Sequence, residues 1–228
     1  MENNILVNQV NVLERASFFR KTYMHLALAV LAFIGVETVL LNVVPEELII
    51  GMVSHKYLWL FFIGAFWLCS ILANKWALSQ SKSTQYFGLG VYVFLEAIIF
   101  MPLLYIAMSY AGFEMIFQAA TLTLAMFAGL SGVAISSKRD FSFLRTFIVV
   151  GGFLALGAIV AGVIFGFNLG LWFSVAMVVL ASASILYETN KLKDHYGTEQ
   201  YVGAALQLFA SVMLLFWYIL RILMSRRD

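Results

Sequence analysis

The chain has 228 residues, of which 63% are hydrophobic and only 11% are charged. A soluble domain is roughly 45 to 50% apolar and about 25% charged, so this composition predicts a polytopic membrane protein of the all-α class. The formal net charge is only +2, and the 14 Lys and Arg residues are scattered among loops, which excludes a nucleic-acid-binding surface.

Seven apolar runs are long enough to cross a bilayer as helices. A hydrocarbon core about 30 Å thick needs about 20 mostly apolar residues in a helix. The expected spans are 24–44, 57–78, 86–108, 113–136, 144–167, 169–189 and 201–223. Two prolines and 16 glycines leave little material for long loops, so we expect a single membrane domain over residues 1–228.

The distribution of Lys and Arg among the loops predicts the orientation. With the amino terminus inside, the inner segments hold ten cations and the outer segments hold four. The ten are Arg15, Arg20, Lys21, Lys75, Lys82, Lys138, Arg139, Arg145, Lys191 and Lys193. An excess of cations on the cytoplasmic side therefore favours an amino terminus inside and a carboxyl terminus outside.

The end of the chain favours the opposite placement of the tail. Arg221, Arg226 and Arg227 precede Asp228 on the side expected to be outside. A re-entrant final segment would place these arginines inside. The final run is nevertheless long enough to cross, and residues 216–218 form an aromatic cluster suited to a membrane interface.

The hairpin at 181–223 carries polar residues where lipid would be unfavourable. Glu188 has Ser184 one helical turn before it, and Gln207 and Ser211 share one face of the next span. If the two faces meet, these four residues form a pocket that senses protons or cations, with Lys191 or Lys193 near its mouth. A hydrogen-bonded packing contact without a regulatory role is the alternative.

Two further acids lie within the apolar runs. Glu96 is ten residues into its run, which at about 1.5 Å per residue places it close to the bilayer midplane. Glu37 lies near the outer end of the first span, where a partly hydrated position on the wall of the bundle is the simpler interpretation. For Glu96, a protonated side chain hydrogen-bonded to a neighbouring helix is the alternative to a functional role.

Motifs for catalysis are missing from the sequence. His25, His55 and His195 show no metal-ligand spacing, and no nucleotide-binding or nucleophile-elbow pattern occurs. We therefore expect a protein that is not an enzyme and that has no cofactor, although calcium could bind at Glu188.

Four segments resemble the Bax inhibitor-1 family, also called the transmembrane Bax-inhibitor-motif family. They are FRKTY at 19–23, SSKRDFSFL at 136–144, ILYETNKL at 185–192 and AALQLFASVMLLFWYILRIL at 204–223. The likeness covers nearly the whole chain in matching order. It is greatest to the bacterial YccA-like branch, which shares the charged loop at Lys138, Arg139 and Asp140.

The resemblance implies a bundle of seven helices with the last one at the centre. It also implies two activities: a pH-sensitive calcium leak controlled by two acidic residues, and, in the YccA-like branch, modulation of the membrane AAA protease FtsH. The acid of the sixth span corresponds to Glu188, and the acid of the seventh falls at Ser211, which has no charge. A latch of two carboxylates that share a proton therefore cannot form here.

These observations predict a regulator in the bacterial inner membrane that contacts the lipid bilayer and binds the FtsH complex. The loop 138–140 is the expected contact on the inner side. The alternative is a pH-regulated calcium or cation leak that uses Glu188 and Glu96. A passive membrane-organising protein is a third possibility, and the sequence leaves the oligomeric state open.

Overall fold

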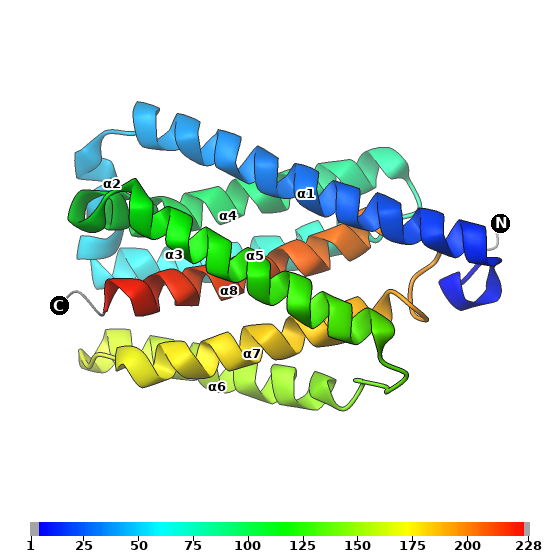
Figure 1. Ribbon diagram of the computed structural model, residues 1–228. Helices are drawn as coiled ribbons and strands as arrows, with labels where there is room; N and C mark the ends of the chain where they lie inside the picture. The colour runs from blue at the N-terminus through cyan, green and yellow to red at the C-terminus, as the bar shows by residue number, and fades with distance from the viewer. Residues whose placement is uncertain (1–4, 226–228) are drawn as a thin grey trace.

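Seven long helices make up nearly all of the computed structural model in Figure 1, which describes residues 5–225. They are α1 (Val12–Val43), α3 (Lys56–Ala77), α4 (Lys82–Ala111), α5 (Phe113–Ser136), α6 (Leu144–Phe165), α7 (Gly170–Lys191) and α8 (Tyr201–Met224). Two shorter helices, η1 (Val7–Gln9) and α2 (Glu46–Ser54), complete the secondary structure of the described residues. The all-α class is thereby confirmed.

Six stretches within residues 5–225 are long and apolar enough to cross a membrane, judged by length and composition. One of them, residues 82–136, contains both α4 and α5, which meet at Gly112. The φ angle of Gly112 is 72°, in the left-handed region that glycine adopts without strain, so the chain can reverse there. Figure 1 shows α4 and α5 running in opposite directions, which gives the seven expected crossings.

The first helix is longer than its apolar run. The α1 helix has 32 residues and begins at Val12, where the Asn11 side chain accepts a hydrogen bond from the Glu14 amide at 2.9 Å. At about 1.5 Å per residue such a helix exceeds a hydrocarbon core about 30 Å thick, so its first turns extend beyond the apolar layer. The expected start at residue 24 reflects hydropathy alone, which does not register a polar helical turn.

The α8 helix lies at the centre of the bundle. It packs against α1, α3, α4, α5 and α7, and 61% of its hydrophobic stretch is buried within the protein. The corresponding shares are 11% for α6 and 6% for α3, which lie at the periphery. The central position of the last helix is thus confirmed, because its side chains pack against helices on all sides.

Two glycines allow α3, α4 and α8 to approach one another closely. A Cβ atom on Gly203 of α8 would lie 2.7 Å from the Ala77 carbonyl oxygen, and one on Gly88 of α4 would lie 2.6 Å from the Ala73 carbonyl oxygen. Both distances are too short for a side chain. The carboxyl-terminal end of α3 is therefore wedged against α4 and α8.

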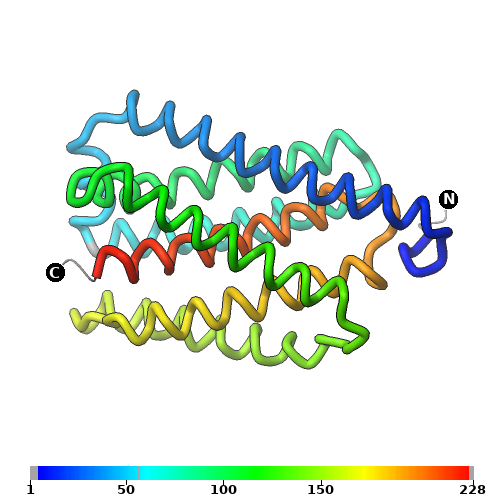
Figure 2. Tube along the Cα trace, viewed as in Figure 1, coloured from blue at the N-terminus to red at the C-terminus, as the bar shows by residue number. Residues whose placement is uncertain are grey.

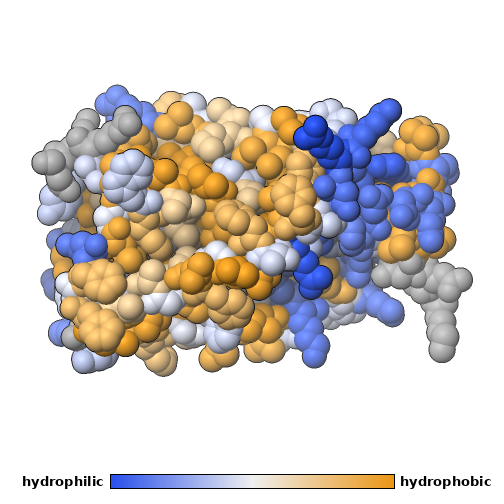
Figure 3. Space-filling view, turned by 90° about the horizontal axis from the view of Figure 1, so that it is seen from below, coloured by the Kyte–Doolittle hydropathy of each residue, from blue (hydrophilic) through white to orange (hydrophobic). Residues whose placement is uncertain are grey.

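The two ends of the bundle differ in polarity. Figure 3 shows hydrophilic residues gathered at the end that contains the amino terminus, beside a mainly hydrophobic middle. This end, here called the basic end, holds the first turns of α1 and the 78–81, 137–143 and 192–200 loops, and with them the ten cations of the expected inner segments. Residues 5 and 225 lie at opposite ends in Figure 2, and the unbroken α8 argues against a re-entrant segment. Arg226, Arg227 and Asp228 lie outside the described residues.

Candidate functional site

The loop between α7 and α8, residues 192–200, is covered by the amino-terminal segment. The Val7 amide donates to the Tyr196 carbonyl at 3.0 Å, and the Thr198 amide donates to the Ile5 carbonyl at 3.1 Å. Leu6 and Gly197 form an antiparallel bridge, and Val7 is fully buried. The start of the described chain therefore fixes the loop that follows Glu188.

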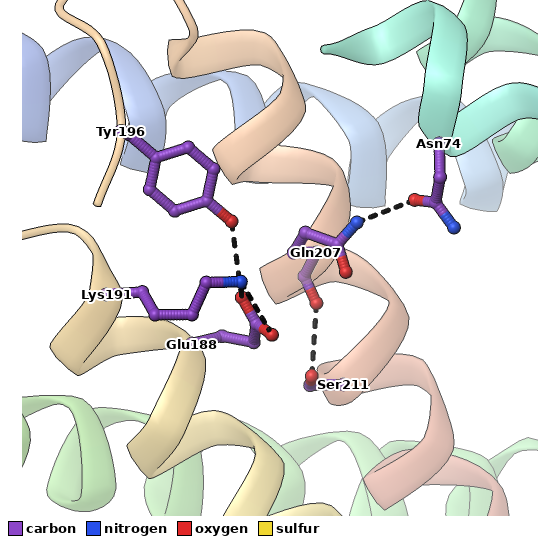
Figure 4. Close-up of polar contacts among 6 residues, drawn as sticks. All are labelled: Asn74, Glu188, Lys191, Tyr196, Gln207 and Ser211. Carbon is purple, nitrogen blue, oxygen red and sulfur yellow. Dashed lines mark hydrogen bonds and ion pairs between the residues drawn. The ribbon is translucent and has the colours of Figure 1, made fainter. Parts of the chain in front are cut away.

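Glu188 is held by two partners at the inner end of α7. The Lys191 ammonium lies 3.0 Å from Oε2 and 3.3 Å from Oε1, and the Tyr196 hydroxyl donates to Oε2 at 3.2 Å. The side chains of Glu188 and Lys191 are only 13% and 23% exposed, so this ion pair is largely shielded from solvent. Figure 4 shows the three side chains converging beside α8.

Tyr196 remains neutral in this arrangement. Burial, followed by the negative charge of Glu188 and the hydrogen bond to it, raises the pKa of Tyr196 well above its usual value. The Lys191 ammonium also lies 5.3 Å from the centre of the Tyr196 ring, a cation–π contact. The tyrosine thus serves as a permanent donor that orients the carboxylate.

Gln207 and Ser211 make different hydrogen bonds from Glu188. Gln207 Nε2 donates to Asn74 Oδ1 of α3 at 2.7 Å, and the Ser211 hydroxyl donates to the Gln207 carbonyl at 3.0 Å. Figure 4 places both α8 residues across the α7–α8 contact from Glu188. Ser184 is half-buried one turn before Glu188 on α7. The structure brings the residues to one helix contact, while the hydrogen bonds of Glu188 go to its own helix and to the following loop.

The second expected lysine has another role. Lys193 donates to the carbonyls of Ala134 and Ser137, at the end of α5, instead of approaching Glu188. Burial lowers the pKa of Lys193. Unpaired carbonyls at a helix end attract a cation, so this contact joins the α7–α8 loop to the end of α5.

The charged loop 138–140 is exposed and fixed in place. Asn190 of α7 donates to the Arg139 carbonyl and accepts from the Phe141 amide, each at 3.4 Å. The Asp140 carboxylate accepts from the amide and the hydroxyl of Ser142, and these bonds hold its pKa below the usual value. The side chains of Lys138, Arg139 and Asp140 are all exposed. A folded loop therefore presents three charges at the basic end.

Glu96 and Glu37 lie in two separate cavities. Glu96 is 6% exposed and lines a cavity of about 510 Å³ that also reaches Arg221. Its Oε2 atom is buried without a hydrogen-bond partner. Glu37 is 4% exposed and lines a second cavity of about 500 Å³ between α1, α4, α5 and α8. The interpretation of Glu37 as a partly hydrated wall residue is wrong, because packing by the neighbouring helices encloses it.

Sequence reasoning did not identify Asn74 and Tyr196, which complete the polar contacts of Gln207 and Glu188. It also did not identify the ion pair of Lys82 with Glu199, whose Nζ and Oε2 atoms are 2.6 Å apart. Asn74 is 133 residues from its partner, and Lys82 is 117 residues from Glu199. Only Tyr196 follows its partner closely, at eight residues, as an aromatic residue in a charged turn.

A family model described as inhibitor of apoptosis-promoting Bax1 matches residues 15–228. An uncharacterised protein of Pseudomonas aeruginosa is 31% identical over 212 residues, which cover 92% of this chain and 89% of the relative. The protein LIFEGUARD 1 of Arabidopsis thaliana is 29% identical and covers 92% of this chain and 89% of its own length. Protein lifeguard 4 of Mus musculus is 28% identical over 48% of this chain and 46% of its own length.

Proposed function

Because this chain belongs to the Bax inhibitor family of membrane proteins, we propose that it is a non-enzymatic regulator that binds the membrane AAA protease FtsH and modulates it. The proposal places the protein in the bacterial inner membrane with the basic end on the cytoplasmic side. An excess of cations on that side supports the orientation. The similarity of the 136–144 segment to the YccA-like branch supports the choice of partner.

The observation that carries the proposal is the pairing of Glu188. Its carboxylate is compensated by Lys191 of the same helix, and Ser211 donates to a carbonyl of its own helix. A helix contact held in this way needs no shared proton to stay closed. Such a contact is suited to a rigid protein that presents a binding surface, and less to a gate that titrates.

The exposed loop 138–140 is the proposed contact with the protease. Asn190 and Lys193, which flank the end of α7, hold this loop and the adjoining end of α5 through backbone carbonyls. The binding surface is thereby preorganised, which lowers the entropy lost on association. Two cations and one anion at fixed positions would favour a partner surface of complementary charge.

Co-purification in mild detergent and protease turnover measurements test this function. We expect FtsH to be retained by the full chain and its degradation of a membrane substrate to change when the chain is present. Lys138→Ala with Arg139→Ala should weaken retention roughly tenfold or more, as expected for charges at a binding surface. The matched control, Glu47→Gln with Glu114→Gln, changes two charges near the other end of the bundle and should have no effect. Unchanged turnover together with no retention would exclude the function.

The cavity that Glu96 lines favours a second candidate function, a proton-regulated cation leak. It extends from Asn168 and Leu169 at the end opposite the basic end to Glu96 in the middle of α4. The unpaired, buried Oε2 of Glu96 at its inner limit is an available ligand for a cation or a proton. Conduction would then require a path past α8 to Glu188.

Calcium flux into liposomes, measured across pH, separates the two functions. A leak predicts flux above that of empty liposomes and a large loss with Glu96→Gln or Glu188→Gln. Glu37→Gln is the matched control, since this acid lies in a different cavity. Flux equal to that of empty liposomes at every pH would exclude the leak and leave the regulator proposal unaffected.

A further inference from the structure

The cavity beside Glu37 is open toward the side of the bundle. It lies in the half away from the basic end, and its volume of about 500 Å³ is within the roughly 300 to 1,000 Å³ of small-molecule sites. Within the described residues, α1 and α5 both pack against α4 and α8 but not against each other. Figure 2 shows α1 and α5 as separate strands of the bundle with α4 and α8 passing behind them.

The opening faces the lipid phase. Ile34, Phe113 and Phe117 line the cavity, and they are 52%, 69% and 63% exposed on the outer surface of a membrane-spanning bundle. Apolar side chains at this position present no barrier to an apolar molecule that arrives through the bilayer. A polar molecule from the aqueous phase would find no such surface.

The polar residues of the lining, with one exception, bond to their own helices. Thr38 Oγ1 donates to the Ile34 carbonyl, Asn42 Nδ2 to the Thr38 carbonyl and Thr123 Oγ1 to the Ala119 carbonyl, each at 2.7 Å. Both carboxyl oxygens of Glu37 are buried and have no hydrogen-bond partner. In the described part of the chain, Glu37 is also the one ionisable side chain that lines this cavity.

This combination selects the chemistry of a ligand. A buried polar group without a partner costs free energy, and a ligand that supplies a donor recovers it. A calcium or magnesium ion requires about six or more oxygen ligands, and one carboxyl group in an apolar wall does not supply them. A single protonated amine attached to an apolar body satisfies both the carboxylate and the wall.

We propose that this cavity binds an amphiphilic amine, which enters from the lipid phase, pairs its protonated nitrogen with Glu37 and fills the space between α1 and α5 with its apolar part. The proposal is independent of protease binding and of ion conduction, since neither uses this cavity. It assigns a ligand class to an acid that the helix contacts described above leave without a partner.

Calorimetric titration of the purified full chain in lipid nanodiscs tests the proposal. The probe is phenylbutylamine, and the comparison is phenylbutanol, which has the same apolar body without the charge. Heat from empty nanodiscs is subtracted to remove partitioning into lipid. We expect the amine to bind the unaltered protein roughly tenfold or more tightly than the alcohol, the difference contributed by a charge-assisted hydrogen bond.

Three variants locate the site. Glu37→Gln should weaken amine binding roughly tenfold or more, without changing the binding of the alcohol. Glu96→Gln, the matched control in the other cavity, should bind the amine as the unaltered protein does. Ala120→Trp fills the cavity from α5 and should remove binding of both compounds while leaving the carboxyl group in place.

Two results would overturn the proposal. One is equal affinity of the unaltered protein for the amine and the alcohol, a comparison that needs no variant to fold. The other is full affinity for the amine in Ala120→Trp or in Glu37→Gln, which would place any binding elsewhere on the protein.

Discussion

Two buried glutamates of this bundle have opposite surroundings. Glu188 lies near the basic end and receives hydrogen bonds from Lys191 and Tyr196. Glu37 lies in the other half, and neither of its carboxyl oxygens has a partner. Both residues are acids within apolar runs, so the sequence presents them as similar. The difference indicates that a satisfied acid fixes a helix contact, while an unsatisfied acid lowers stability and leaves a position for a ligand.

Removing the cation beside Glu188 should have the largest effect. Lys191→Met leaves a shielded carboxylate without its counter-charge, so we expect the free energy of unfolding to fall by about 2 kcal/mol. Thermal unfolding of the purified protein in detergent measures the loss. Lys75→Met removes an exposed lysine from the same end and serves as the control. Equal losses in the two variants would show that the pairing of Glu188 contributes nothing specific.

Removing only the donor beside Glu188 should have a smaller effect of the same sign. Tyr196→Phe keeps the ring and deletes the hydroxyl, so we expect a loss of about 1.5 kcal/mol, typical of a hydrogen bond to a charged group. The comparison variant is Tyr110→Phe, whose residue is 81% exposed and should show no change. A Tyr196→Phe protein as stable as the unaltered one would remove the tyrosine from the site.

Removing the unsatisfied acid should change stability in the opposite direction. Glu37→Leu replaces two unpaired buried oxygens with an apolar side chain, so we expect the free energy of unfolding to rise by about 1 kcal/mol. Glu188→Leu, measured in parallel, should lower it. A loss of stability in both variants would contradict the contrast between the two acids.

The exposed ion pair of Lys82 and Glu199 should have the smallest effect. Its side chains are 36% and 62% exposed, so Lys82→Met should cost only about 0.5 kcal/mol at neutral pH. The hydrogen bond from Lys82 holds the pKa of Glu199 below its usual value. This contribution is present above the ordinary glutamate pKa of about 4.3 and is lost as pH falls through the lowered value. Unfolding temperatures of the variant and the unaltered protein should therefore converge in acid, and a gap that widens there would refute this assignment.

Long apolar runs were sufficient to predict the seven crossings, because a bilayer of fixed thickness requires them. The central position of the last helix was expected from the family resemblance alone, and packing on all sides of α8 confirms it. The polar start of α1 and the whole of α2 were not predicted. Neither is a complete apolar span: the capped first turns of α1 are polar, and α2 has nine residues, too few to cross.

The candidate site was predictable only in part. The cost of charge in lipid drew attention to Glu188, Glu96 and Glu37. Their partners depend on contacts between distant segments, such as Gln207 with Asn74, which no local pattern encodes. The depth of Glu37 was misjudged for a related reason. Its burial depends on how α4 and α8 pack around α1, and distance along one helix does not describe that packing.

The central position of α8 also constrains how the protein is made. During synthesis α1 to α7 emerge before α8, so the surfaces that later surround it have no protein partner while the ribosome is still translating. The bridge between Leu6 and Gly197 likewise forms only after most of the chain exists. Segments that wait for distant partners expose aggregation-prone surfaces. The last hairpin therefore completes the bundle in a single late step, and until that step Glu188 lacks the loop tyrosine that orients it.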